Sequence, residues 1–148
     1  MRSIYALPFA LLIVMIVAAQ AAPRVKDERV DKGRYIVNNV AMCTDCHTPM
    51  LSDGKPDPNR PLAGAKIGFK PTGKVPAWAS VSPDLTPGGQ LKGWTTDQWV
   101  HFLMTGVNPR GNHADPPMPQ YRMNKADAEA VTAYIKSLPP IKPTVAWR

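Results

Sequence analysis

The middle of the chain, residues 48–93, restricts the fold more than any other part of the sequence. It holds eight prolines and seven glycines, and neither a helical nor a strand period of apolar residues runs through it. Irregular segments of this length are uncommon inside a small compact domain. The segment becomes reasonable if it wraps a large apolar cofactor, which would supply the core that the segment lacks. Six apolar side chains are expected to line that cofactor: Leu62, Ile67, Phe69, Val75, Trp78 and Leu85.

A cysteine motif stands directly before this segment. Cys43 and Cys46 are separated by two residues and followed by His47, which is the C-x-x-C-H attachment pattern of c-type haem. The spacing lets both sulfurs reach one edge of a porphyrin, while the imidazole of His47 can bind the iron. The chain has two cysteines and carries the motif once. We therefore expect one covalently attached haem c, with His47 as the proximal iron ligand.

Other uses of the motif fit the sequence less well. A zinc site would need two further ligands at suitable spacing, and His101 and His113 do not form a paired motif. A redox-active dithiol normally belongs to a thioredoxin-like pattern of strands and helices, which this sequence lacks. A structural disulfide explains neither the helix before the cysteines nor His47. Haem attachment is the preferred interpretation.

The second axial ligand of the iron is less constrained by spacing. The candidates are Met50, Met104, Met118, Met123, His101 and His113. Met50 is too close to His47 to reach the opposite face of the haem. Met104 lies on the apolar side of its helix and is expected in the hydrophobic core. His101, on the same helix, is expected to be exposed or satisfied by local contacts.

Met118 is the predicted distal ligand. It lies between prolines, in the run Pro116-Pro117-Met118-Pro119. Proline fixes the backbone torsion φ, so the surrounding backbone can hold the thioether in place without a helix. A thioether also gives the iron a higher reduction potential than a second imidazole would. His113 and Met123 remain the alternatives.

Three helices are predicted outside the irregular segment. Residues 27–42 combine apolar positions at helical spacing with a charged first half. Thr95 or Thr96 can cap a second helix that ends at Gly106. Asn124 can cap a third helix, which Pro139 and the proline after it would end. Strand signals are limited to short isolated pieces, so the sequence predicts an all-α domain with three to four helices and long Pro/Gly-rich loops.

The N-terminus reads as an export signal. Arg2 precedes an almost unbroken apolar run over residues 4–17, and small residues follow at 18–21. Cleavage after Ala21 would leave a mature domain of residues 22–148 outside the cytoplasm, in the periplasm. The alternative is an uncleaved anchor over residues 4–22, which is near the lower length limit for spanning a bilayer. Membrane association through this segment would follow.

The net charge of +7 falls to +6 when residues 1–21 are removed, because Arg2 is their one charged residue. Nucleic acid is an improbable partner for an exported chain without a recognised binding motif. The charge instead favours encounters with acidic protein surfaces or anionic lipid. Residues 60–92 contain one acidic residue, Asp84, and five basic residues: Arg60, Lys66, Lys70, Lys74 and Lys92. The alternative is that these lysines only keep the loop soluble.

Several segments resemble a known family. The segments Gly33-Arg34-Tyr35-Ile36-Val37 and Cys43-Thr44-Asp45-Cys46-His47-Thr48-Pro49 resemble the first helix and attachment site of bacterial monohaem cytochromes c of class I, with His/Met ligation. Pro61-Leu62-Ala63-Gly64, Pro117-Met118-Pro119 and Tyr134-Ile135-Lys136-Ser137-Leu138-Pro139-Pro140 are similar to cytochrome subunits of membrane-associated alcohol and sugar-acid dehydrogenases. Those subunits usually carry several such domains, whereas this chain carries one.

The resemblance implies a class I cytochrome c fold in which the first and last helices cross near Gly33 and Tyr134. It also implies Met118 as the distal ligand. The predicted function is a single-haem electron carrier, not an enzyme, that passes electrons between a dehydrogenase and a respiratory acceptor such as an oxidase or another cytochrome. The alternatives are a haem enzyme or gas sensor with a labile sixth ligand, or a fixed electron-transfer subunit of a dehydrogenase complex.

Overall fold

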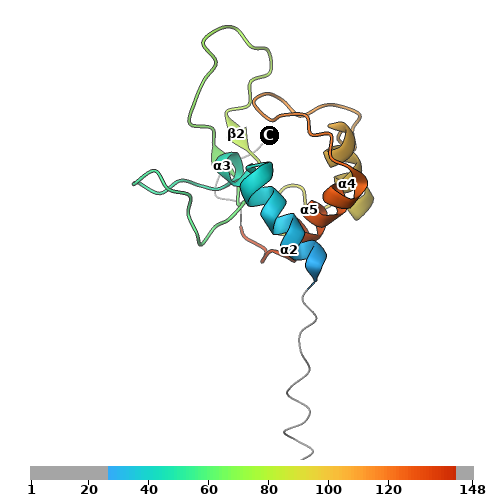
Figure 1. Ribbon diagram of the computed structural model, residues 1–148. Helices are drawn as coiled ribbons and strands as arrows, with labels where there is room; N and C mark the ends of the chain where they lie inside the picture. Colours follow the sequence, from blue (N-terminus) through green and yellow to red (C-terminus); the bar gives the residue numbers. More distant parts are fainter. Residues whose placement is uncertain (1–26, 143–148) are drawn as a thin grey trace, which may run out of the picture.

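The computed structural model of the chain describes residues 27–142 (Figure 1). In this part the helices are α2 (Glu28–Tyr35), the π-helical turn η1 (Ile36–Val40), α3 (Cys43–His47), α4 (Thr96–Thr105) and α5 (Lys125–Ser137). The strands are β1 (Ala65–Lys66) and β2 (Val81–Ser82), which form one short antiparallel pair. The predicted all-α fold is confirmed, since this pair is the only sheet among the described residues.

Two predictions concern residues outside that range. The export signal of residues 1–21 and the alternative anchor of residues 4–22 both lie before the first described residue. Between residues 27 and 142, no helix combines the length and the apolar character that a membrane span requires.

The first predicted helix is shorter than expected and ends in a different way. Asp27 caps α2 by accepting a hydrogen bond of 3.0 Å from the backbone N–H of Arg29. The last turn widens into η1, where the N–H of Ala41 bonds to the carbonyl of Ile36, five residues back, at 2.8 Å. Met42 then adopts a left-handed conformation with φ of 49°. This residue ends the helix and starts α3, so the cysteine motif forms a short helix of its own.

The helices α2 and α5 pack closely against each other, as Figure 1 shows. The contact depends on Gly33, because a Cβ atom there would overlap the backbone carbonyl of Ala130 and approach the Cβ of Tyr134 to 2.8 Å. An ion pair of 2.6 Å between Lys32 and Asp127 joins the same two helices. The crossing near Gly33 and Tyr134 is confirmed.

The boundaries of α4 and α5 agree with their predicted caps. Thr95 and Gln98 form a capping box at the start of α4, and Gly106 ends the helix with a φ of 75°. Asn124 caps α5 by accepting a hydrogen bond of 2.9 Å from the N–H of Asp127. The inner faces of these helices bury Trp99, Leu103, Val131 and Ile135 in the core.

The irregular segment is anchored at its base and projects at its tips (Figure 1). Leu62 is fully buried in the core. Among the six expected lining residues, Ile67 and Leu85 border the internal cavity, whereas Leu62, Phe69, Val75 and Trp78 do not. The prediction is wrong for Phe69 and Val75, which are 54% and 39% exposed, because the loop between β1 and β2 carries them away from the body of the molecule.

Candidate functional site

A cavity of about 720 Å³ lies between α3, β2, α4, α5 and the loop that follows α4. One wall is apolar and is formed by Leu85, Leu91, Trp94, Trp99, Phe102, Leu103, Val131 and Ile135. Trp94 contacts Trp99 at a ring distance of 5.1 Å and Phe102 at 5.4 Å, so the aromatic part of this wall is tightly packed. The cavity has the volume and the apolar lining of a cofactor site.

Three of the four predicted site residues line this cavity: Cys43, His47 and Met118. Cys46 lies on the same short helix, α3, but is partly exposed and does not line the cavity. His47 and Met118 are 71 positions apart in the sequence. Folding brings both side chains to the same cavity.

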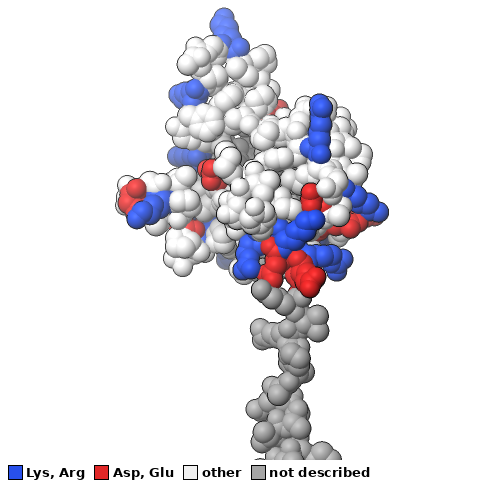
Figure 2. Space-filling model, in the orientation of Figure 1, with Lys and Arg blue, Asp and Glu red and all other residues white. Residues whose placement is uncertain are grey.

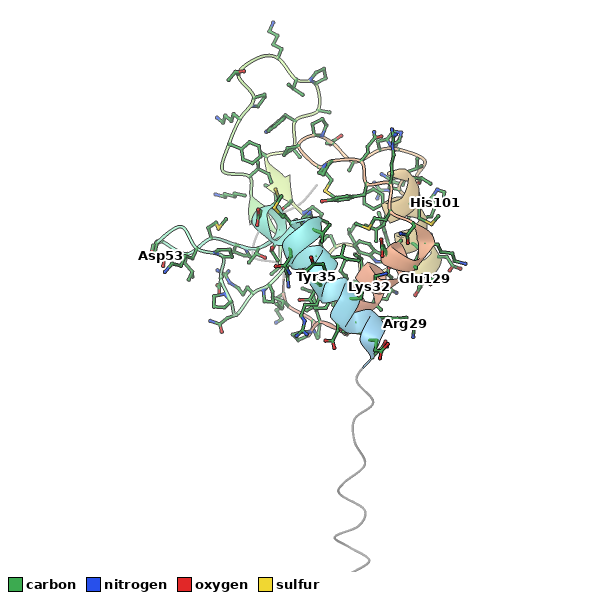
Figure 3. The ribbon with its side chains drawn as sticks, in the orientation of Figure 1. Arg29, Lys32, Tyr35, Asp53, His101 and Glu129 are labelled. Carbon is green, nitrogen blue, oxygen red and sulfur yellow. The ribbon has the colours of Figure 1, made fainter. Side chains whose placement is uncertain are left out.

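The other candidate ligands are distributed differently. His113 also lines the cavity, with its Nδ1 3.2 Å from the carbonyl oxygen of Gly106. Met123 does not line it and packs against the hydrophobic core instead. His101 is exposed on α4, as predicted (Figure 3). Met104 was expected in the core, and this is wrong, because its side chain is 37% exposed. Consecutive residues of a helix point about 100° apart, so Met104 turns toward solvent while its neighbour Leu103 is buried.

The ring of His47 is oriented by the backbone of the irregular segment. Its Nδ1 lies 2.8 Å from the carbonyl oxygen of Pro83, and the side chain is buried. Burial lowers the pKa of His47, and the bond to Pro83 opposes this effect only in part. The ring is therefore neutral, with Nδ1–H donating to Pro83, and Nε2 keeps the lone pair that a metal ligand needs.

Cys43 and Cys46 do not form a disulfide with each other. Burial raises the pKa of Cys43 to about 11, although the neighbouring hydroxyl of Tyr121 acts in the opposite direction. Burial and the neighbouring charge of Asp45 also raise the pKa of Cys46. Reactive dithiols have lowered thiol pKa values, because the thiolate is the nucleophile. This environment therefore does not favour thiol–disulfide exchange by the pair.

Contacts from distant residues hold α3 in place. The hydroxyl of Ser82 donates a hydrogen bond to the carbonyl of Cys46, and the N–H of Gly64 donates one of 2.7 Å to the carbonyl of His47. The hydroxyl of Tyr121, which also lines the cavity, donates to the carbonyl of Ala41 at 2.5 Å. Sequence reasoning missed the roles of Pro83 and Tyr121, since no local spacing connects either residue to the cysteine motif.

The loop that carries Met118 is fixed on both sides. The N–H of Met118 donates to the carbonyl of Asp115 at 3.2 Å, and the N–H of Ala79 donates to the carbonyl of Pro116 at 2.7 Å. The peptide bond between Pro116 and Pro117 is cis. The second of these hydrogen bonds connects the methionine loop to the segment before β2.

The residues around the cavity fit a haem group. Aromatic and aliphatic side chains supply a water-excluding wall, and a buried neutral imidazole and a thioether supply the two kinds of axial ligand that cytochromes use. The two thiols of α3 stand at the attachment spacing. A mostly helical domain with this set of donors at one cavity defines a haem-binding domain of the electron-transfer class.

The chain belongs to the cytochrome c family, whose model matches residues 30–139. This match confirms the class I fold and implies covalently bound haem c with its iron, and it gives the chain an electron-transfer role.

Three curated proteins are similar to the chain. It is 29% identical, over 74% of its length, to the fructose dehydrogenase cytochrome subunit of Gluconobacter japonicus. It is 30% identical, over 76% of its length, to a diheme cytochrome c-type protein of Cereibacter sphaeroides. It is 28% identical, over 73% of its length, to a nicotinate dehydrogenase subunit of Pseudomonas putida. The matches span only 22%, 36% and 9% of these relatives, respectively.

Proposed function

We propose that this chain is an exported electron carrier that holds one haem c through Cys43 and Cys46, with His47 and Met118 as the two axial ligands. The observation that carries the proposal is that His47 and Met118 line one cavity, whose lining also includes Trp94, Trp99 and Phe102. When bound, haem c supplies reversible one-electron chemistry through its iron.

The residues of the chain have distinct tasks in this proposal. The thiols of Cys43 and Cys46 anchor the macrocycle, and the carbonyl of Pro83 keeps the imidazole of His47 in one orientation and tautomer. Met118 lines the same cavity as His47 and would supply a thioether ligand that keeps substrates from the iron. The packed rings of Trp94, Trp99 and Phe102 give the cavity an apolar surface against which a macrocycle could pack. A closed and rigid site of this kind suits electron transfer, because little reorganisation accompanies a change of charge.

The proposed partners are a dehydrogenase that donates electrons and an oxidase or cytochrome that accepts them. Two of the relatives carry the word dehydrogenase in their names, which supports a donor of that class. The basic character of the chain favours partners with acidic docking surfaces. The charged and apolar pattern of residues 1–21 supports export to the periplasm.

Mass spectrometry of the native protein under non-reducing conditions tests attachment and export together. We expect the mass of residues 22–148 plus one haem, and this mass should survive unfolding because the haem is covalent. A haem lost on unfolding, or a second haem, would refute the proposed site. A protein that keeps residues 1–21 would favour the anchored form.

Carbon monoxide binding separates the carrier from a haem enzyme or gas sensor. The reduced native protein should bind carbon monoxide slowly and incompletely, because Met118 occupies the sixth position. Rapid and complete binding would instead indicate an open or labile site. The same measurement after mild denaturation serves as the control, since the displaced methionine should then allow binding.

A fixed subunit of a dehydrogenase complex is the second candidate, because the similar protein from Gluconobacter japonicus is named as a dehydrogenase cytochrome subunit. Purification from native membranes under mild detergent separates the two. A fixed subunit should co-elute with a dehydrogenase at a constant ratio, whereas a mobile carrier should elute alone.

A further inference from the structure

The loop between β1 and β2, together with Lys66, forms a projection that we call the arm (residues 66–80). It rises away from the helices in Figure 1, and Figure 2 shows basic side chains spaced along it. The arm carries three exposed lysines, Lys66, Lys70 and Lys74, and has no acidic residue.

These lysine charges are not neutralised within the described part of the chain. The ion pairs recorded between residues 27 and 142 use other cations: Arg29, Lys32, Arg34, Lys55, Arg60 and Lys125. The arm is therefore a local excess of positive charge at the surface. Such an excess attracts acidic surfaces and raises association rates at low salt.

The arm also presents ordered apolar side chains between its lysines. Phe69 is 54% exposed, yet its ring packs edge-on against Trp78 at a centroid distance of 5.7 Å and an interplanar angle of 77°. Val75 is exposed on the other limb. An exposed aromatic residue that is held in one position is typical of the anchor residues of protein interfaces, since little side-chain entropy is lost on binding.

The base of the arm is part of the cavity. Ile67, Ala79 and Ser80 line the cavity, and the N–H of Ile67 bonds to the carbonyl of Ser80 at 2.9 Å to close the base. The bond from Ala79 to Pro116 ties this base to the loop that carries Met118. A molecule that binds the arm therefore lies beside the edge of the cavity that Ile67, Ala79 and Ser80 line.

We propose that the arm inserts into an acidic recess of the redox protein that exchanges electrons with this chain, with Phe69 as the apolar anchor and the three lysines as charge contacts. This inference rests on the proposed electron-transfer function. A membrane is the less favoured partner, because surface-bound segments usually bury a broad amphipathic face, whereas the arm exposes two separate large apolar side chains, Phe69 and Val75.

The test compares two variants with the same change in net charge. The arm variant carries Lys66→Ala, Lys70→Ala and Lys74→Ala, and the control variant carries Lys55→Ala, Lys125→Ala and Lys142→Ala. Stopped-flow measurements follow reduction of the native haem-loaded chain by reduced flavodoxin, an acidic redox protein, over a range of ionic strength. We expect the second-order rate constant at low salt to fall about tenfold in the arm variant and less than about twofold in the control. Phe69→Ala should lower the rate and leave its salt dependence unchanged.

A neutral small reductant, hydroquinone, distinguishes failure of the docking proposal from failure of the proposed function. Both variants should react with it as the wild type does, because it needs no docking surface. Irreversible or absent haem reduction of the wild type would overturn the electron-carrier function itself. Two results with flavodoxin would overturn the docking role of the arm and leave the electron-carrier function intact. One is an equal decrease in rate constant in the two variants, and the other is a wild-type rate that does not depend on salt.

Vesicles of phosphatidylcholine and phosphatidylserine test the membrane as the other partner. The wild type and both variants should bind them equally weakly in sedimentation. A loss of vesicle binding confined to the arm variant, with an unchanged flavodoxin rate, would overturn the proposal in favour of a lipid surface.

Discussion

The hydroxyl of Tyr121 donates a hydrogen bond of 2.5 Å to the backbone carbonyl of Ala41. Tyr121 lies three residues after Met118, and Ala41 lies two residues before Cys43. This bond therefore connects the segment of the proposed distal ligand directly to the segment that leads into the attachment motif.

Replacement of Tyr121 by phenylalanine should loosen that connection. We expect Tyr121→Phe to lower the free energy of unfolding by about 0.5–1.5 kcal/mol, the usual net value of one hydrogen bond. Added imidazole should also displace Met118 at a lower concentration than in the wild type. Urea unfolding and optical titration of the oxidised protein measure the two effects. Tyr134→Phe is the matched control, because no hydrogen bond to a described residue is recorded for the Tyr134 hydroxyl. Equal effects of both variants would contradict the assigned role.

Removal of the proposed distal ligand should open the iron without releasing the haem. Met118→Ala should keep covalent haem, lower the reduction potential and allow rapid carbon monoxide binding, because a thioether that raises the potential is lost. Potentiometry and stopped-flow binding measure these changes. Met123→Ala should retain the wild-type values, since Met123 does not line the cavity. His113→Ala tests the remaining alternative, and a larger shift in potential for His113→Ala than for Met118→Ala would transfer the ligand role to His113.

The helix crossing at Gly33 leaves no room for a side chain. Gly33→Ala should lower the free energy of unfolding by about 1–3 kcal/mol, because the added methyl overlaps the backbone of Ala130. The better helix propensity of alanine offsets at most about 1 kcal/mol of this cost. Urea unfolding of the haem-loaded protein measures the difference. Gly68→Ala and Gly73→Ala are controls with no atom within 4 Å of the added Cβ, and their stability should stay close to that of the wild type.

The burial of Asp84 should make the stability of the protein depend on pH. Its side chain is fully buried, one carboxylate oxygen accepts from the N–H of Thr86 at 2.7 Å, and the other has no partner among the described residues. Burial raises the pKa of Asp84 against the effect of the Thr86 hydrogen bonds. A raised carboxyl pKa stabilises the folded state below the unfolded value of about 3.9, and this contribution disappears as the pH rises through the folded value.

The variant Asp84→Asn removes that ionisation. Its stability relative to the wild type should therefore be greatest near neutral pH and should decrease as the pH falls toward about 4. Urea unfolding at several pH values measures this change. Asp53→Asn, in the exposed loop where Figure 3 labels Asp53, removes a surface carboxylate and serves as the control. A constant difference between Asp84→Asn and wild type across the range would contradict the prediction.

The sequence predicted the elements whose boundaries depend on local chemistry. Thr95, Gly106 and Asn124 place the ends of α4 and α5 correctly, because capping bonds involve neighbouring residues. The left-handed turn at Met42 was not predicted, since a positive φ at a non-glycine residue is imposed by the surrounding fold. The separate helix α3 follows from that turn.

At the candidate site, too, the sequence did not predict contacts between residues that are far apart in the chain. The C-x-x-C-H spacing pointed to Cys43, Cys46 and His47, and the flanking prolines pointed to Met118; their roles as haem anchors and ligands stay predictions. The contact of His47 with Pro83 joins residues 36 positions apart, and no sequence pattern predicts it. Phe69 was expected inside because it is apolar, but the path of the loop places it at the surface.

Two hydrogen bonds hold the base of the arm, one from Ile67 to Ser80 and one from Ala79 to Pro116. They fix this edge of the cavity without contributions from the rest of the arm. Loop closure entropy rises only slowly with length, so the residues between these bonds can be lengthened or exchanged at small cost. The proposed recognition of a partner and the proposed iron site therefore lie in parts of the chain that can evolve separately.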